Sequence, residues 1–498
     1  MSSGEGQAGT REPAADLGLL DATMIGMGAM IGAGIFVLTG LAADIAGPGA
    51  ILVFVLNGVV TTFTGIAYAE LASAIPKSGG GYAFVREVFE DLASFLMGWM
   101  LAFAYMIAGA LYALGFAGNL AEFVHIYWAG LPVGPIWAGG PEWAVVYAAA
   151  AVAGFVALNV VSTKASGGAE TAITLVKIVI LVVFVGFGVL VVDLGSFEPM
   201  FPGGKTAASL LPAMGLTFIA FEGYDLITTV TEEVEDPRKN IPRAIFLSLA
   251  ATVIIYLLVV TVAIGTLGWE ELAVAGETGI AEAAKGFMPA IPVLGTGASF
   301  IAFGAVFSTL SALNAVVIAS SRVVFAMGRE DQLPDPLGQI SARYGTPSAA
   351  LLASAAIMLV SVAVVPLERV GRMASLFFLL SFVVVNASVI RLRRRRPDMR
   401  RPYSMPLYPA PPVLGILLNC VLAFYLIRDD PVAAVYSLGW VVVGAAVYLG
   451  LERRGDDDEG DGGPTDGEGN VPTESGTGDR QAGRRIDEAM GRNRGSER

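Results

Sequence analysis

Cysteine and histidine are nearly absent from this chain. Its 498 residues contain one cysteine, Cys420, and one histidine, His125. A single cysteine excludes a disulfide framework, and one cysteine with one histidine cannot form a Cys/His metal cluster. The sequence also shows no paired carboxylates and no Ser/His arrangement of the kind that enzyme active sites use. We therefore expect no metal, no cofactor, no enzymatic activity and no nucleic acid partner.

Charge is also scarce, and long apolar runs fill most of the chain. Charged residues make up 15% of the sequence and hydrophobic residues 55%, and the mean hydropathy is +0.66. About 20 apolar residues are enough for a helix to cross a bilayer. We expect an all-α membrane protein with twelve transmembrane helices. They are expected near residues 19–41, 49–74, 92–124, 143–162, 169–192, 208–231, 243–265, 294–326, 349–366, 373–391, 411–427 and 431–450.

Basic residues are distributed unevenly between alternate loops. If the N-terminus lies inside, the cytoplasmic side holds most lysines and arginines, including the block 391–401. The outside then keeps only Lys205, Lys285, Arg369, Arg372 and Arg428. This asymmetry follows the positive-inside rule, so we expect a multi-pass protein of the cell membrane, surrounded by lipids, with both termini in the cytoplasm. Residues 1–18 lack the basic and cleavable features of a signal peptide and are expected to form a cytoplasmic segment.

Glycine interrupts the first expected span. Within MGAMIGAGIFVLTG, residues 27–40, the triplet Gly32-Ala33-Gly34 lies inside the apolar run. A helix in lipid must satisfy its own backbone, so this triplet predicts a break that faces a cavity. The groups freed by the break would be the N–H groups of Ala33, Gly34 and Ile35 and the C=O groups of Met30 and Ile31. The first set suits a carboxylate and the second an ammonium or a cation, which is half of a site for a zwitterion.

A lysine interrupts the fifth expected span. Lys177 lies in the cytoplasmic half of the run 169–192. An ionisable residue at this depth is costly, so it marks a candidate functional site facing the protein interior. A buried lysine can exchange its proton and can occupy the place of a sodium ion, and we expect Lys177 to be a proton-coupling group. The alternative is that its long side chain snorkels to the inner interface.

The sixth expected span repeats the feature of the first. Phe221-Glu222-Gly223 lies near the centre of the run 208–231. Two interrupted helices at corresponding places, with four spans between them, indicate a transporter built from inverted repeats. The sixth helix would then enter from outside. Its outer half would end in free C=O groups, which can take an ammonium, at Ile219, Ala220 and Phe221.

Two acids accompany this second break. Asp225 is placed to cap the inner half of the helix, because a short carboxylate accepts from free N–H groups at a new N-terminus. Glu222 has no such structural role, so we expect it to bind a cationic side chain, to carry a proton or to pair with an internal base. Packing as a neutral, protonated carboxyl is the alternative, since that form is tolerated in a dry site.

Four separated stretches resemble the amino acid–polyamine–organocation (APC) superfamily of transporters. They are IGAGIF (31–36), YAELASAIPKSGGGYAFVRE (68–87), AFEGYD to EEVEDPRKNIPRAI (220–245) and SALNAVVIASSRVVFAMGRED (311–331). They stand in the family's order, and the resemblance covers residues 19–451. It implies a LeuT-like fold with five-helix inverted repeats at 19–192 and 208–391, two additional helices at 411–451, and alternating access around a central amino acid site.

The resemblance also assigns roles to individual residues. It implies that the substrate carboxylate binds the backbone at Gly32, Ala33 and Gly34. For the amine, it implies a site at Phe218, Ile219, Ala220 and Phe221. It implies that Lys177 acts beside residues of the eighth helix, where the candidates are Ser308, Thr309 and Ser311. Relatives usually have an apolar residue at the position of Glu222, so this acid argues against a purely hydrophobic specificity.

Two further segments lie outside the expected core. Glu70 stands at the end of the second span, and we expect it to cap or to pair with a basic residue at the inner interface. The segment 452–498 is acidic and of low complexity, so we expect a disordered, solvating cytoplasmic tail. Recruitment of a regulator is the alternative for this tail, and protein partners stay open.

These observations lead to three functional hypotheses. The first is a secondary transporter that moves neutral or cationic amino acids with protons, with Lys177 and Glu222 as candidate coupling residues. The second is an obligate exchanger of amino acids, or of an amino acid and its amine, at the same site. The third is an amino acid sensor that does not transport.

Overall fold

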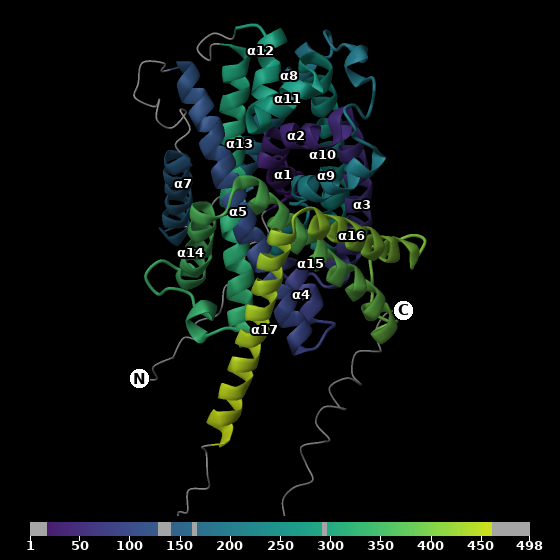
Figure 1. Cartoon of the computed structure of the whole chain (residues 1–498). Coiled ribbons are helices and arrows are strands. Elements are labelled where there is room, and N and C mark those ends of the chain that lie inside the picture. The colour runs from purple at the N-terminus through teal and green to yellow at the C-terminus, as the bar shows by residue number, and fades with distance from the viewer. Residues whose placement is uncertain (1–16, 128–140, 162–166, 291–295, 461–498) are drawn as a thin grey trace, which may run out of the picture. The chain divides into compact units, whose positions relative to one another are not determined.

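The computed structural model describes residues 17–127, 141–161, 167–290 and 296–460 (Figure 1). In these ranges the regular elements are helices, and one parallel bridge pairs Leu17 with Val234. The α-helices are α1 (Leu19–Met30), α2 (Ala33–Ala46), α3 (Ala50–Ala74), α4 (Gly80–Arg86), α5 (Asp91–Tyr127), α7 (Pro141–Val161), α8 (Gly167–Gly188), α9 (Leu210–Thr217), α10 (Pro237–Leu267), α11 (Trp269–Ala275), α12 (Gly279–Phe287), α13 (Gly297–Arg329), α14 (Ser348–Val364), α15 (Leu367–Arg395), α16 (Ala410–Asp429) and α17 (Pro431–Gly460). The 3-10 helices are η1 (Gly47–Gly49), η2 (Leu194–Phe197), η3 (Ala207–Ser209), η4 (Phe218–Phe221), η5 (Asp225–Glu233), η6 (Gly276–Thr278) and η7 (Asp335–Gly338).

The helices confirm an all-α membrane protein. The described residues contain 10 helical segments that are long and apolar enough to cross a membrane. The first, Leu19–Ala74, joins the first two expected spans, and α14 is a shorter apolar helix at the expected ninth span. Each of the twelve expected spans therefore coincides with helix.

Small residues let the central helices approach one another. Figure 1 shows α5 running beside α13, and these two helices share an extensive contact. A Cβ atom at Gly98 of α5 would lie 2.6 Å from the sulfur of Met327 on α13. Glycine at this position therefore allows the close helix packing that is typical of membrane proteins.

The last helix carries an apolar surface. Val435, Leu438 and Val442 on α17 are exposed, as expected for a helix that faces lipid. The helix continues to Gly460, past residue 452, where we expect the acidic tail to begin. Most of that tail, residues 461–498, and the N-terminal residues 1–16 lie outside the described residues.

Candidate substrate site

The first span is broken at Ile31 and Gly32. Helix α1 ends at Met30 and α2 begins at Ala33, and Gly32 has φ −111° and ψ −138°. The Gly32 N–H donates to the Met30 carbonyl at 2.7 Å, so a tight turn closes α1 there. The break therefore lies earlier than the expected Gly32-Ala33-Gly34 triplet, and Ala33 and Gly34 already belong to the first turn of α2. Their N–H groups, with that of Ile35, are at the N-terminus of α2, where helices attract anions.

The second break follows η4. Glu222 is extended, with φ −80° and ψ 147°, and Gly223 has φ +131°, which favours glycine. A Cβ atom at Gly223 would lie 2.7 Å from the backbone nitrogen of Met30, so a side chain there would strike the first break. The segments on either side of the second break are 3-10 helices. Sequence alone predicted the place of this interruption, but it did not predict that 3-10 helices rather than α-helices flank it.

The two breaks lie against each other in the core. A Cβ atom at Gly34 would lie 2.5 Å from the Cα of Ala220. All positions from Met30 to Ile35 and from Phe218 to Glu222 are buried. The structure thus brings together the two sets of residues that the sequence predicts for a zwitterionic substrate.

A tyrosine that we did not predict joins the two breaks. The Tyr256 hydroxyl on α10 lies 2.5 Å from the Met30 carbonyl oxygen and 3.0 Å from the Ala220 carbonyl oxygen. One hydroxyl has one proton, so it donates to one of the two carbonyls at a time. The only sequence signal was a tyrosine inside an apolar span, where its hydroxyl requires a partner.

One of the three candidates on the eighth helix reaches the first break. The Ser308 hydroxyl on α13 donates to the Ile31 carbonyl at 2.5 Å. The Thr309 hydroxyl lies instead 2.8 Å from the Ala305 carbonyl and 3.0 Å from the Val306 carbonyl of its own helix, and Ser311 is buried. Among the carbonyls expected to be free for an ammonium, those of Met30, Ile31 and Ala220 therefore lie within hydrogen-bonding distance of hydroxyl groups. The carbonyl of Ile219 accepts from the Glu222 N–H at 3.2 Å, so it is not free either.

Lys177 on α8 is fully buried and contacts α1. Its ammonium donates to the Gly28 carbonyl oxygen at 2.8 Å. In an uninterrupted helix this carbonyl would accept from the N–H of Gly32, which here bonds to Met30. The lysine therefore lies at the C-terminal end of α1, where a cation is favoured by the helix dipole. Its buried position does not agree with snorkelling.

The two acids beside the second break have different surroundings. Asp225 accepts from the Gly223 N–H at 2.9 Å and from the hydroxyl of Tyr105 on α5. Asp225 is the first residue of η5, whose N-cap is Tyr224, and among the described residues no side-chain hydrogen bond caps this helix. The predicted capping role is therefore wrong, and Asp225 instead binds the break at Gly223 and the hydroxyl on α5. Glu222 is 3% exposed, and in the part of the chain that the structure describes neither of its carboxylate oxygens has a hydrogen-bond partner.

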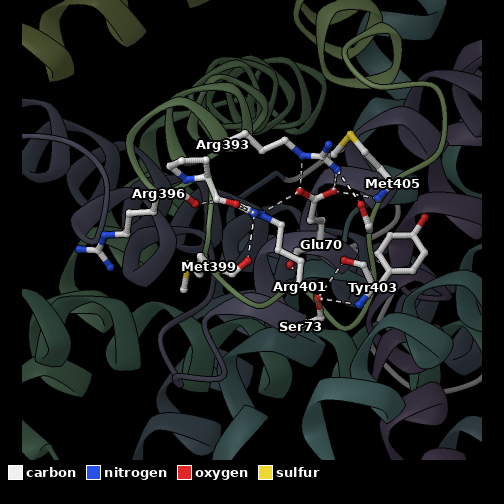
Figure 2. A network of polar contacts seen from close by, with 10 residues as sticks. Glu70, Ser73, Arg393, Arg396, Met399, Arg401, Tyr403 and Met405 are labelled. Carbon is white, nitrogen blue, oxygen red and sulfur yellow. Dashed lines mark hydrogen bonds and ion pairs between the residues drawn. The ribbon is translucent and has the colours of Figure 1, made fainter.

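Glu70 forms a polar network away from the breaks (Figure 2). Its carboxylate, only 1% exposed, accepts two hydrogen bonds of 2.7 Å from the Arg393 guanidinium, and Arg401 lies 3.6 Å away. The Met405 N–H also donates to it, at 2.8 Å. The expected pairing of Glu70 with a basic residue is thus present, and it attaches the segment between α15 and α16 to the end of α3.

Further contacts join segments on either side of the two breaks. At the end of η5, Arg322 of α13 donates to Glu233 at 3.3 Å, and the Leu17 N–H donates to the Glu233 carbonyl at 3.0 Å. In the middle of α2, η6 packs against Gly40. Beside it the carboxyl of Glu277 lies against Gly118 of α5, and withdrawal from water raises the pKa of Glu277 to about 7.

A family model described as amino acid permease matches residues 17–450. The chain belongs to the amino acid permease family. This confirms the resemblance to the APC superfamily, and the permease is a multi-pass membrane transporter of amino acids rather than an enzyme.

Several curated proteins are similar to the permease over nearly their whole length. The branched-chain amino acid permease BcaP of Bacillus subtilis is 29% identical over 455 residues, which cover 88% of this chain and 93% of BcaP. The methylthioribose transporter of the same organism is 30% identical over 458 residues, or 90% and 95% of the two chains. Its serine/threonine exchanger SteT is 26% identical over 448 residues, or 88% and 97%.

Proposed function

We propose that the permease is a proton-coupled symporter of neutral or cationic amino acids, with Lys177 as the coupling residue. The observation that supports this most directly is the hydrogen bond from the buried Lys177 ammonium to the Gly28 carbonyl. Loss of the proton from Lys177 would remove the cation from the end of α1 and weaken the attachment of α8 to α1. Protonation is thereby linked to the position of a broken helix.

The substrate would bind between the two breaks. Its carboxylate would accept from the N–H groups at the start of α2, and its ammonium would donate to carbonyls at the end of η4. The proposed carboxylate site is Gly32, Ala33, Gly34 and Ile35, and the proposed amine site is Phe218, Ile219, Ala220 and Phe221, with Met30 and Ile31 opposite. Because Tyr256 already contacts Met30 and Ala220, the incoming ammonium would compete with its hydroxyl.

Alternating access would expose this site to one side at a time. The breaks are buried, and Arg322 pairs with Glu233 while η6 packs against Gly40 of α2, contacts that would have to rearrange to open a path to the site. We place both termini in the cytoplasm of a plasma-membrane protein, because this orientation puts most basic residues inside. The inverted repeats would be residues 19–192 and 208–391, with peripheral helices at 411–451.

Uptake into proteoliposomes tests the proposal. A pH gradient, acidic outside and without sodium, should drive accumulation of labelled amino acids by the wild type. Lys177→Ala should abolish accumulation while retaining exchange or binding. Lys239→Ala, which alters an exposed lysine, serves as the control and should leave uptake unchanged. Accumulation that requires sodium, or that survives Lys177→Ala, would rule out Lys177 as the coupling residue.

The second candidate is an obligate exchanger, favoured by the similarity to SteT, which is named as a serine/threonine exchanger. An exchanger would take up labelled amino acid only into vesicles preloaded with amino acid. Uptake into empty vesicles under the pH gradient would exclude this alternative.

A further inference from the structure

Glu222 is a buried acid whose side chain has no part in the proposed binding of the substrate carboxylate and ammonium by backbone groups. It lies between η4 and Gly223, at the point where the second break meets Met30 and Ala29 of α1. The side chain is 3% exposed, and neither carboxylate oxygen has a hydrogen-bond partner in the described residues. Its position is therefore inside the proposed substrate site, with both acceptor oxygens available.

Within the ranges that the structure describes, the titratable groups around Glu222 give its carboxyl no hydrogen-bond partner that would explain a structural role. The titratable groups that interact with it electrostatically include Asp225 and four tyrosines, Tyr68, Tyr105, Tyr112 and Tyr224. Asp225 is occupied by Tyr105 and the Gly223 N–H, and the Lys177 ammonium donates to Gly28. Tyr112 also lies beside Gly32, so Glu222 and the first break face the same helix, α5.

Elementary electrostatics restricts the state of such a carboxyl. An ionised carboxylate without hydrogen bonds in a dry site is strongly disfavoured. When the site is closed, Glu222 must therefore hold a proton or contact a cation. A neutral, protonated carboxyl satisfies this requirement in the absence of substrate, and a cationic group of the substrate would satisfy it when the site is filled.

We propose that Glu222 binds the positively charged side chain of a cationic amino acid, and that a proton takes this position when a neutral amino acid occupies the site. The inference rests on the proposed transport function and adds a determinant of substrate class to it. On binding a cationic substrate, the O–H bond of Glu222 breaks and its proton passes to water. The carboxylate then pairs with the incoming guanidinium or ammonium group.

Arginine and citrulline provide matched ligands for the test, because citrulline carries a neutral urea group in place of the guanidinium. Binding of both is measured on the purified full-length protein. Glu222→Gln keeps the size of the side chain and removes its charge. We expect arginine affinity to fall at least about tenfold, as for loss of a charged hydrogen-bonded pair, while citrulline affinity changes by less than about twofold. Glu270→Gln, an exposed position on α11, is the control and should change neither.

A second measurement needs no variant. Binding of arginine by the wild type in weakly buffered solution should release about one proton per ligand, and binding of citrulline should release none. Arginine affinity should accordingly rise with pH. In Glu222→Gln this proton release should disappear. If the variant loses both ligands, proton release by the wild type decides between a recognition role and a structural one.

Three results would overturn the inference. They are absence of arginine binding to the wild type, a Glu222→Gln variant that still binds citrulline and has lost no more affinity for arginine than for citrulline, and arginine binding to the wild type without proton release. Uptake of citrulline driven by a pH gradient would at the same time show that the transport function stands. Failure to bind or move any amino acid would instead refute the transport function, and the inference with it.

Discussion

At the scale of single residues, the site is defined by polar groups that satisfy broken backbone. Lys177, Ser308 and Tyr256 come from three different helices, and each contacts a carbonyl at the end of α1. The last carbonyls of a helix lack intrahelical partners, so a break inside a membrane needs donors from neighbouring helices. These three side chains provide them.

Tyr256→Phe should destabilise the protein without substrate. Removal of the hydroxyl leaves a buried carbonyl at Met30 or Ala220 without its donor, which costs about 1–3 kcal/mol. We expect a lower melting temperature for the purified variant than for the wild type. Tyr436→Phe, which removes an exposed hydroxyl on α17, is the matched control and should melt like the wild type. Equal melting of all three proteins would show that the Tyr256 contact does not stabilise the breaks.

At the scale of elements, glycines determine how closely the two broken helices approach. Gly34 has an ordinary helical position in α2, so its importance is not conformational. Its missing side chain leaves room for the backbone of η4, at Ala220. The close contact between the breaks therefore depends on the absence of one methyl group.

Gly34→Ala should abolish or strongly reduce transport. The added Cβ atom would lie 2.5 Å from the Cα and Cβ of Ala220, so η4 must move away from α2. The groups for the substrate carboxylate and amine would then separate, and we expect uptake to fall more than about tenfold, since small displacements of a binding geometry have large effects. Gly154→Ala on α7, where no atom lies within 4 Å of the added Cβ, should retain uptake. Normal uptake by both variants would contradict close packing of the breaks.

At the scale of the whole molecule, contacts between distant segments hold the helices together. Glu70 on α3 and Arg393 on α15 are 323 residues apart in sequence, yet they form a doubly hydrogen-bonded pair. The same carboxylate accepts from the Met405 N–H, so it also positions the chain that leads to α16 (Figure 2). Such a pair joins the first predicted repeat to the chain just after the second one.

Glu70→Gln should lower the free energy of unfolding by about 2–3 kcal/mol. The amide can replace one acceptor, but it leaves the Arg393 guanidinium without its counter-charge, and loss of one partner of a buried charged pair is destabilising. Thermal or denaturant unfolding of the purified protein measures the effect. Glu235→Gln, at an exposed position after η5, provides the control. A variant as stable as wild type would show that the network contributes specificity of packing rather than stability.

The sequence by itself determined the membrane class, the helical spans and the approximate places of both breaks. These features are local: an apolar run of bilayer length can only be a helix in lipid, and glycine inside such a run marks a break. Lys177 and Glu222 were also visible as candidates, because an ionisable residue within an apolar run stands out without any structure.

Only the tertiary structure decided which groups meet. Sequence could not identify Tyr256 as the link between the breaks, Arg393 as the partner of Glu70, or Ser308 rather than Thr309 as the contact of Ile31. It also placed the first break too late, and it could not show that Ala312 of α13 packs against Gly32, where an added Cβ atom would lie 2.6 Å from the Ala312 Cβ. Each of these contacts joins residues on helices far apart in the chain, and their distances follow from the packing of whole helices, for which no local pattern exists.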